Sequence, residues 1–408
     1  MQKYPPLEEW ESELTRRFPG LSKPQVIGLA LWSFGMVLAK SCGLSAVITM
    51  LAPLLVVKEN SLRQRLREWY YEAEAKKGVQ RTALVVSGCF PFLLDWVLSL
   101  WNGTQFALAL DATSLGSRFV VLVVSVVYRG CAIPVAWSIL KAGDPGAWNP
   151  VWRQMLKQLK ARIPKRMTVL VLTDRGLFSQ GLFRAIRRVK WHPFMRIKRG
   201  GTFLPATGRT FKPLKSLVPH PGTSWKGTGK AFKTKPLSCT LLALWEEGRD
   251  APWLIVTDLP PEASDACWYG LRVWIEQGFK ITKRGGWQWH RTRMTDPERA
   301  ERLWLAVAVA TLWLLSVGGQ AEDSIPESTF LDVTAALQQR KRQRKATQLR
   351  LVSIFRRGWC TILVTMFRQA PLPLGVFAPE PWPQPPAFEE EEGPPMQPYR
   401  KEAKKTYP

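Results

Sequence analysis

The sequence predicts an α/β protein in which a mixed sheet with flanking helices follows a helical N-terminal region. Apolar runs rich in Val and Ile, which favour strands, occupy residues 106–110, 119–128, 132–140 and 168–173. Apolar residues recur at helical spacing in 146–163 and again in 182–189. Before residue 102 the spacing is helical almost throughout, which separates this region from the sheet.

The N-terminal region is expected to hold four helices, at residues 26–40, 44–57, 61–76 and 89–101, with Asn60 as a cap of the third. That third helix carries four polar or basic side chains on neighbouring turns, namely Arg63, Gln64, Arg65 and Arg67. A basic helix after a short turn is typical of a DNA-recognition helix. It is equally typical of a solvated basic face, so both interpretations stay open.

The first three strands are separated by turns at Gly116 and at Gly130, so we expect an antiparallel meander. A helix, the strand 168–173, a helix that Ser179 can cap, and a strand at 193–197 follow. Strands joined through helices add in parallel. Three strands, helix, strand, helix, strand is the order of an RNase H-like core.

Two aspartates end strands of this core. Asp111 closes the first strand and Asp174 the fourth, which would lie side by side in an RNase H-like sheet. Aspartate is depleted in strands, and a buried carboxylate without a partner is costly, so a metal ion is a suitable partner. The alternative is that each aspartate only ends a strand or starts a turn.

A further acid lies in a helical segment among cations and a phenol. The side chains of Tyr269, Arg272, Glu276, Lys280 and Lys283 follow spacings that keep them close to one helix face. A carboxylate surrounded by cations suits a face that meets a metal ion and phosphates together. The alternative is a solvated helix with an intrahelical ion pair between Arg272 and Glu276.

Together these residues resemble the DDE transposases of bacterial insertion sequences, in the group with a Y-(2)-R-(3)-E-(6)-K signature. Tyr269, Arg272, Glu276 and Lys283 match every spacing of the signature. The two aspartates lie in LALDAT and VLTDRG, as in that family. The resemblance covers roughly residues 20–320.

The resemblance implies that Asp111, Asp174 and Glu276 are catalytic and hold two divalent ions, Mg²⁺ or Mn²⁺, about 4 Å apart. It implies a transposase that binds terminal inverted repeats, cleaves the transposon ends by hydrolysis and transesterification through a hairpin, and joins the 3′-ends to target DNA. Tyr269, Arg272 and Lys283, with Lys280 beside them, would bind DNA phosphates. The implied partners are double-stranded DNA and a second copy of the chain.

A mostly β insertion subdomain is also implied, and residues 200–258 fit it, with strand-like runs at 237–245 and 253–257. Its tryptophans Trp225, Trp245 and Trp253 are candidates to stack on a flipped base, and burial in a small sheet is the alternative for each. Trp287 and Trp289 either line a DNA channel or pack on the next helix.

We therefore expect a helical DNA-binding domain at 1–102 and a catalytic domain at 103–320 that the insertion interrupts. A basic helical C-terminal region at 321–369 follows, in which Arg340, Lys341 and Arg342 are candidates to bind DNA or to pair two chains. The proline-rich residues 370–408 are expected to be a disordered tail.

Composition agrees with this interpretation. A formal charge of +26 and a pI near 10.2 favour a polyanionic partner. The apolar run 303–317 is shorter than the ~20 residues needed to span a bilayer, so we expect a buried core helix and no membrane partner. Six scattered cysteines without a C-x-x-C pair suit a reducing cytoplasm and argue against zinc.

Two other functions stay open on sequence alone. One is a transposase-derived DNA-binding protein without catalysis, which has no need of three clustered acids. The other is an RNase H-like nuclease that cuts DNA without joining it.

Overall fold

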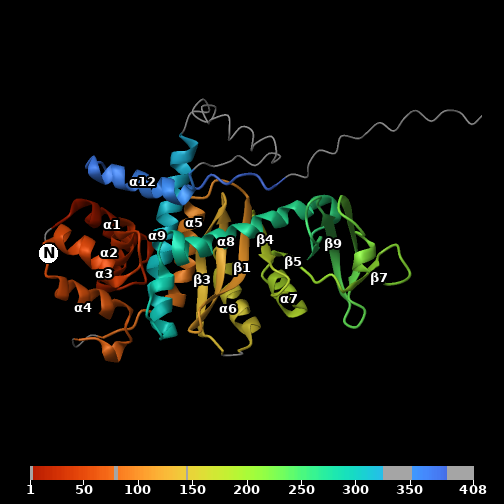
Figure 1. The fold of residues 1–408 in the computed structure, drawn as a ribbon, viewed down its shortest axis with the longest axis horizontal. Coiled ribbons are helices and arrows are strands. Elements are labelled where there is room, and N and C mark those ends of the chain that lie inside the picture. Colours follow the sequence, from red (N-terminus) through yellow and green to blue (C-terminus); the bar gives the residue numbers. More distant parts are fainter. Residues whose placement is uncertain (1–2, 78–80, 144–145, 325–351, 384–408) are drawn as a thin grey trace, which may run out of the picture.

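The computed structural model describes residues 3–77, 81–143, 146–324 and 352–383. The helices before residue 71 lie at one end of the molecule, the sheet lies in the middle, and a small group of strands extends to the other end (Figure 1). The long helix α9 (Pro297–Asp323) runs between these helices and the sheet (Figure 1).

Five strands form the centre of the sheet in the order β3-β2-β1-β4-β5. The first three make an antiparallel meander, and β4 and β5 add in parallel through α6 (Trp148–Lys160) and α7 (Gln180–Arg188). This mixed sheet with flanking helices is consistent with the predicted RNase H-like fold. The strands are β1 (Gln105–Leu115), β2 (Phe119–Tyr128), β3 (Cys131–Lys141), β4 (Thr168–Thr173) and β5 (His192–Arg196).

Residues 200–258 are rich in strands, as the sequence predicted, and they continue the central sheet. Backbone pairing of β10 with β5, at Val256↔Met195, joins the two parts, so the described strands form one ten-stranded sheet. Along β8 half-buried and exposed residues alternate, which is typical of an antiparallel strand with one solvated face. The strands are β6 (Thr202–Pro205), β7 (Lys212–Pro213), β8 (Thr223–Ala231), β9 (Leu237–Trp245) and β10 (Trp253–Thr257).

The N-terminal region contains the four expected helices and one more. The additional helix is α1, which starts at Pro5. The sequence prediction missed it because two prolines stand at its start, although proline is tolerated in the first turn of a helix. The expected cap at Asn60 is wrong: α4 begins at Glu59 after the N-cap Lys58, which places an acid in the favourable first turn. The helices are α1 (Pro5–Arg17), α2 (Lys23–Ala39), α3 (Leu44–Leu55), α4 (Glu59–Tyr70) and α5 (Phe90–Ser99).

The core helix predicted around residues 303–317 is α9 (Pro297–Asp323). Asp296 caps it by accepting a hydrogen bond from the backbone N–H of Arg299 at 2.9 Å. By length and composition α9 is the one described helix that could cross a membrane alone, but 94% of its most apolar window is buried in the protein. The pair α2 and α3 passes the same test only with a 97° bend. Burial of α9 among other elements identifies it as a core helix.

The predicted C-terminal helix is present as α12 (Ile354–Phe367), and it crosses α9 at very short range. A Cβ atom on Gly358 would clash with the carbonyl oxygen of Leu314, and one on Gly318 would clash with that of Ile354. Neither position accepts a side chain unless the helices separate. The basic segment with Arg340, Lys341 and Arg342 lies outside the described residues.

The expectation of disorder from residue 370 onward is wrong for residues 370–383. Phe377 lies opposite Trp101 in a β-bridge, in which its backbone N–H donates to the carbonyl of Leu100 and its carbonyl accepts from the N–H of Asn102. The indole of Trp313 donates to the carbonyl of Pro373 at 2.8 Å. Phe377 and Trp382 are both buried. These apolar side chains anchor a proline-rich segment that average composition alone assigns to disorder.

The crossing of α9 and α12 yields a stability prediction. We expect Gly358→Ala to lower the free energy of unfolding by about 1–3 kcal/mol, because the added methyl group overpacks the crossing. Urea unfolding measures the change. Gly88→Ala is the matched control, since a Cβ at Gly88 meets nothing within 4 Å. Equal stability of the two variants would contradict the proposed role of this contact.

A second prediction concerns the ion pair that joins the N-terminal region to α9. Arg299 binds both carboxylate oxygens of Glu72, and its hydrogen bonds lower the pKa of Glu72 from 4.5 to about 2. A lowered folded-state pKa adds stability above pH 4.5 that is lost as the pH falls toward 2. Because Glu72 is 37% exposed, we expect Glu72→Gln to cost under ~1 kcal/mol at pH 7.

Urea unfolding of Glu72→Gln and the native chain between pH 3 and 7 tests this effect. The two stability curves should converge as the pH falls below 4.5. Glu74→Gln is the control, because Glu74 is exposed and has no ion pair in the described part of the chain. A difference that stays constant with pH would refute the role of the ionised pair.

Candidate active site

The two aspartates are brought together because β1 and β4 are paired in parallel. The prediction that Asp111 closes the first strand is wrong, because β1 continues to Leu115 through its pairing with β2, whereas Asp174 directly follows β4 as predicted. The register places Leu110 opposite Thr173, so Asp111 and Asp174 follow at equivalent positions. The Oδ1 atom of Asp111 accepts a hydrogen bond from the backbone N–H of Ala112 at 2.8 Å. The carboxylate of Asp174 makes no hydrogen bond or ion pair with any described residue.

The signature segment is helical but irregular. It begins as a 3-10 helix (Ala266–Val273), continues as α8 (Trp274–Lys280) and ends in a π-helical turn (Ile281–Gly285). The backbone N–H groups of Gly286 and Trp287 both donate to the carbonyl of Ile281, which closes the wide turn. The expectation of one regular helix is therefore wrong, and π-helical turns inside helices occur frequently at functional sites.

Arg272 connects two of the three acids. Its Nη2 atom lies 2.6 Å from Oδ2 of Asp111, and its Nη1 atom lies 2.7 Å from Oε1 of Glu276. The intrahelical ion pair that the spacing allowed is present, and it also reaches the strand that carries Asp111. The Arg272 and Asp111 side chains are 13% and 14% exposed, whereas Glu276 is 52% exposed. Arg272 therefore holds a largely buried carboxylate and a solvent-facing one.

Burial dominates the electrostatics of the site. It raises the pKa of Asp111, the guanidinium of Arg272 opposes that rise, and the nearby carboxylates of Asp174 and Glu276 add to it. Burial lowers the pKa of Arg272, but Asp111 and the other neighbouring acids raise it above its usual value. Three acids that repel one another favour a bound cation.

The other two signature residues, Tyr269 and Lys283, each donate a hydrogen bond to one of the two strands next to the acids. The hydroxyl of Tyr269 donates to the carbonyl of Thr173, directly before Asp174, at 3.3 Å. The Nζ atom of Lys283 donates to Oγ1 of Thr113 at 2.6 Å, and burial lowers the pKa of this lysine. Sequence reasoning missed Thr113, although the strand period of two places it on the face of Asp111.

Lys280 does not join this group. It is exposed, and its side chain has no hydrogen bond or ion pair with the residues that the structure describes. Its place one turn after Glu276 leaves it facing solvent.

The donor set fits a hard divalent ion, because three carboxylates supply only oxygen ligands and the Asp174 carboxylate has no hydrogen-bond or ion-pair partner among the described residues. Across the described ranges, however, no three Asp, Glu, His or Cys side chains are arranged to hold a metal ion. Arg272 engages two of the three carboxylates instead. The residues fit a metal ion by chemistry, and a three-ligand site requires Arg272 to release Asp111 and Glu276.

The candidate stacking tryptophans lie in different environments. Trp253 packs edge-on against the ring of Tyr269, with ring centroids 5.4 Å apart, and so contacts the signature. Trp225 packs on Phe203, and Trp245 is buried, with its indole donating to the backbone of Arg249. Of the three, only Trp253 contacts a signature residue.

Trp287 and Trp289 are core residues. Both are fully buried, the indole of Trp287 donates to Thr311 at 2.8 Å, and Trp289 packs edge-on against Trp304. The alternative in which they pack on the following helix is therefore the one observed.

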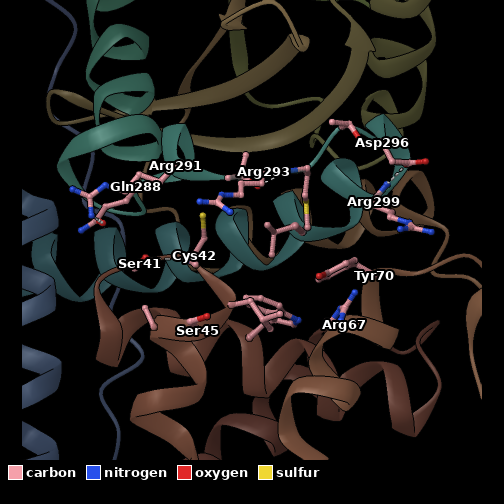
Figure 2. A pocket seen from close by; sticks show the side chains of 18 of the residues that line it. Ser41, Cys42, Ser45, Arg67, Tyr70, Gln288, Arg291, Arg293, Asp296 and Arg299 are labelled. Atoms are coloured by element: carbon pink, nitrogen blue, oxygen red, sulfur yellow. Dashed lines mark hydrogen bonds between the residues drawn. The ribbon is translucent and has the colours of Figure 1, made fainter. Parts of the chain in front are cut away.

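The basic helix α4 has mixed surroundings. Gln64 donates to Glu68 at 2.8 Å, the Nη1 atom of Arg63 lies 3.5 Å from Oγ of Ser45, and Arg65 is exposed. Arg67 faces a cleft between α4 and the segment that follows the signature (Figure 2). The DNA-binding role of these four residues therefore stays a prediction.

Comparison with known proteins found one similar family model over part of the chain. Residues 146–313 match the family model described as a transposase DDE domain, a range that contains Asp174 and the whole signature. No curated protein matches the sequence. A crystal structure of human ENDOV aligns with 56% of this chain and 89% of its own, at 15% identity and a TM-score of 0.23, which is too low to support an argument. Residues 146–313 are therefore similar to a transposase DDE domain, which supports the resemblance found in the sequence.

Proposed function

We propose that this protein is the transposase of a bacterial insertion sequence, which binds the terminal inverted repeats, cleaves the ends and joins the 3′-ends to target DNA. The observation that carries the proposal is that Asp111 within β1 and Asp174 directly after β4 occupy equivalent positions of two paired strands, while Arg272 joins Asp111 to Glu276. The match to a transposase DDE domain supports it. The surplus of positive charge suits double-stranded DNA as substrate.

Asp111, Asp174 and Glu276 would hold two divalent ions, Mg²⁺ or Mn²⁺. When bound, such ions activate a water or a 3′-hydroxyl and stabilise the leaving oxygen of a phosphodiester. The chain itself supplies position: Asp111 and Asp174 are fixed by strand pairing, and Glu276 comes from a helix that Tyr269 ties to β4.

Arg272 has a second role in this proposal. While it bridges Asp111 and Glu276 it keeps two like charges together. When DNA enters, its guanidinium transfers to a phosphate, for which its planar donors are well suited, and the two carboxylates are released. Lys283, which donates to Thr113 of β1, provides a second cation for the phosphates of the bound DNA.

The second-strand route and the assembly are also part of the proposal. We place a DNA hairpin on this pathway, and Trp253, in contact with Tyr269, is the best-located candidate to stack on its flipped base. A dimer on paired ends and a cytoplasmic site of action complete the proposal.

The first test uses a labelled duplex taken from the sequence that flanks this protein's own gene. With Mg²⁺ we expect cleavage and strand joining by the native chain, and a loss of at least about 10³-fold in Glu276→Gln, because a neutral amide removes one charged ligand. Gel analysis separates nicked, hairpin and joined products. Glu262→Gln, an exposed acid, is the control.

The products distinguish the possible functions. Binding of the duplex without cleavage by the native chain would favour a DNA-binding protein. Cleavage without joined product would favour a nuclease. Chelation of divalent ions with EDTA should abolish cleavage, and cleavage that persists in EDTA would refute the metal role of the three acids.

The proposed role of Arg272 predicts that its replacement raises the affinity for a metal ion but lowers the rate of DNA cleavage. Without DNA, Arg272→Gln should bind Mn²⁺ about tenfold more tightly, an effect of ~1.4 kcal/mol, because a competing positive charge is removed. Calorimetric titration measures the affinity. The same variant should cleave DNA more slowly. Arg284→Gln, a nearby exposed arginine without an ion pair among described residues, is the control. Weaker Mn²⁺ binding by Arg272→Gln would contradict the exchange.

A further inference from the structure

A basic cleft lies between the N-terminal region and the segment that follows the signature. Its volume is about 650 Å³, which is within the range of ligand pockets. One wall carries Arg67 and Tyr70 from α4, and the other carries Arg291 and Arg293 (Figure 2). Arg299, at the start of α9, lies at one end of the cleft (Figure 2).

The charge of the cleft is unbalanced. The guanidinium groups of Arg67, Arg291 and Arg293 are exposed, and none is paired with a carboxylate in the described ranges. Arg299 is neutralised by Glu72. The lining carboxylate of Asp296 already caps α9. Three unmatched positive charges on two facing walls attract an anion with several charges along its length.

Both walls are fixed before any ligand binds. The backbone N–H of Cys42 donates to the carbonyl of Trp287 at 2.7 Å, which joins the N-terminal region to the opposite wall. Arg118, in the turn after β1, donates from Nη1 to the carbonyls of Thr292 at 2.5 Å and Met294 at 3.0 Å. Little ordering entropy is then lost on binding.

The cleft adjoins the catalytic segment. His290, three residues after Trp287, contacts the carbonyl of Lys283, whose ammonium group binds Thr113 on the strand of Asp111. The same short segment of chain therefore connects the phosphate-binding lysine of the signature with Arg291 and Arg293. A polynucleotide held at Lys283 has a basic path that continues into the cleft.

One aromatic ring is stacked among the cations. The guanidinium of Arg299 lies 4.2 Å from the ring centroid of Tyr71, and that of Arg67 lies 5.7 Å from it. The Nε atom of Arg67 also donates to the Tyr71 hydroxyl at 3.0 Å. This stack holds Arg67 in place while its remaining N–H groups stay available to a phosphate.

We propose that this cleft binds the backbone of the DNA strand that leaves the active site, with Arg67, Arg291 and Arg293 each contacting a phosphate. The proposal rests on the transposase function above and extends it to a second contact region. Three guanidinium groups on two walls match successive phosphates of a strand better than the single phosphate of a free nucleotide.

The salt dependence of binding tests the proposal. Anisotropy with the labelled flanking duplex, at several salt concentrations, gives the slope of log Kd against log salt. Each lost phosphate contact should reduce that slope by about 1, so Arg291→Gln/Arg293→Gln should reduce it by about 2. The control is Lys165→Gln/Arg166→Gln, an exposed pair before β4 at the opposite end of that strand from Asp174. The control should keep the native slope, and melting temperatures verify folding of both variants.

A phosphate-by-phosphate experiment identifies the contact. Single phosphates of the duplex are replaced by uncharged methylphosphonate, and each duplex is titrated with native and variant chains. At one or two positions we expect the replacement to weaken native binding but to have no further effect on Arg291→Gln/Arg293→Gln. Additive losses at every position would overturn the proposal, as would a native slope in the cleft variant.

The outcomes separate this inference from the proposed function. If the native chain cuts the flanking DNA but the cleft variant keeps the native slope, the cleft assignment fails and the transposase function stands. If the native chain never cuts but the cleft variant loses phosphate contacts, the cleft binds DNA and the catalytic proposal fails. Competition by free nucleotides at equal phosphate concentration would instead assign the cleft to a mononucleotide.

Discussion

The parallel pairing of β1 with β4 is the constraint on which the rest of the site depends. Because Leu110 lies opposite Thr173, Asp111 within β1 and Asp174 directly after β4 come to equivalent positions, although a helix and two strands separate β1 from β4 in sequence. A shift of one residue in either strand would turn one carboxylate to the opposite face. The pairing is surrounded by buried apolar strands, which fix the register.

The acids of the site repel one another when they are ionised, and the positive charge of Arg272 offsets this repulsion. Burial and the neighbouring carboxylates both disfavour ionised Asp111, and Arg272 offsets them by bridging Asp111 and Glu276. An arginine suits this role because it stays charged and binds two carboxylates at once. The same planar donors suit phosphates, and the proposed exchange of Arg272 between the carboxylates and DNA rests on this property.

The signature segment also organises the region beyond the acids. Its π-helical turn ends at a pair of buried tryptophans, Trp287 and Trp289, that pack on α9. This packing leads the chain from Lys283 to the wall of the basic cleft, where Arg118 and Cys42 fix it. The signature segment and the basic cleft are thus joined by core packing.

The sequence by itself determined the strands of the core, the buried helix α9 and the identity of the signature residues, because period, length and spacing are local properties. It missed α1 and the ordered residues 370–383, whose stability comes from distant partners such as Trp101 and Trp313. Only the tertiary structure decided that Arg272 bridges Asp111, that Lys283 meets Thr113 and that α4 forms one wall of a cleft. Contacts between residues so far apart in sequence depend on how complete elements pack, and no local pattern encodes that geometry.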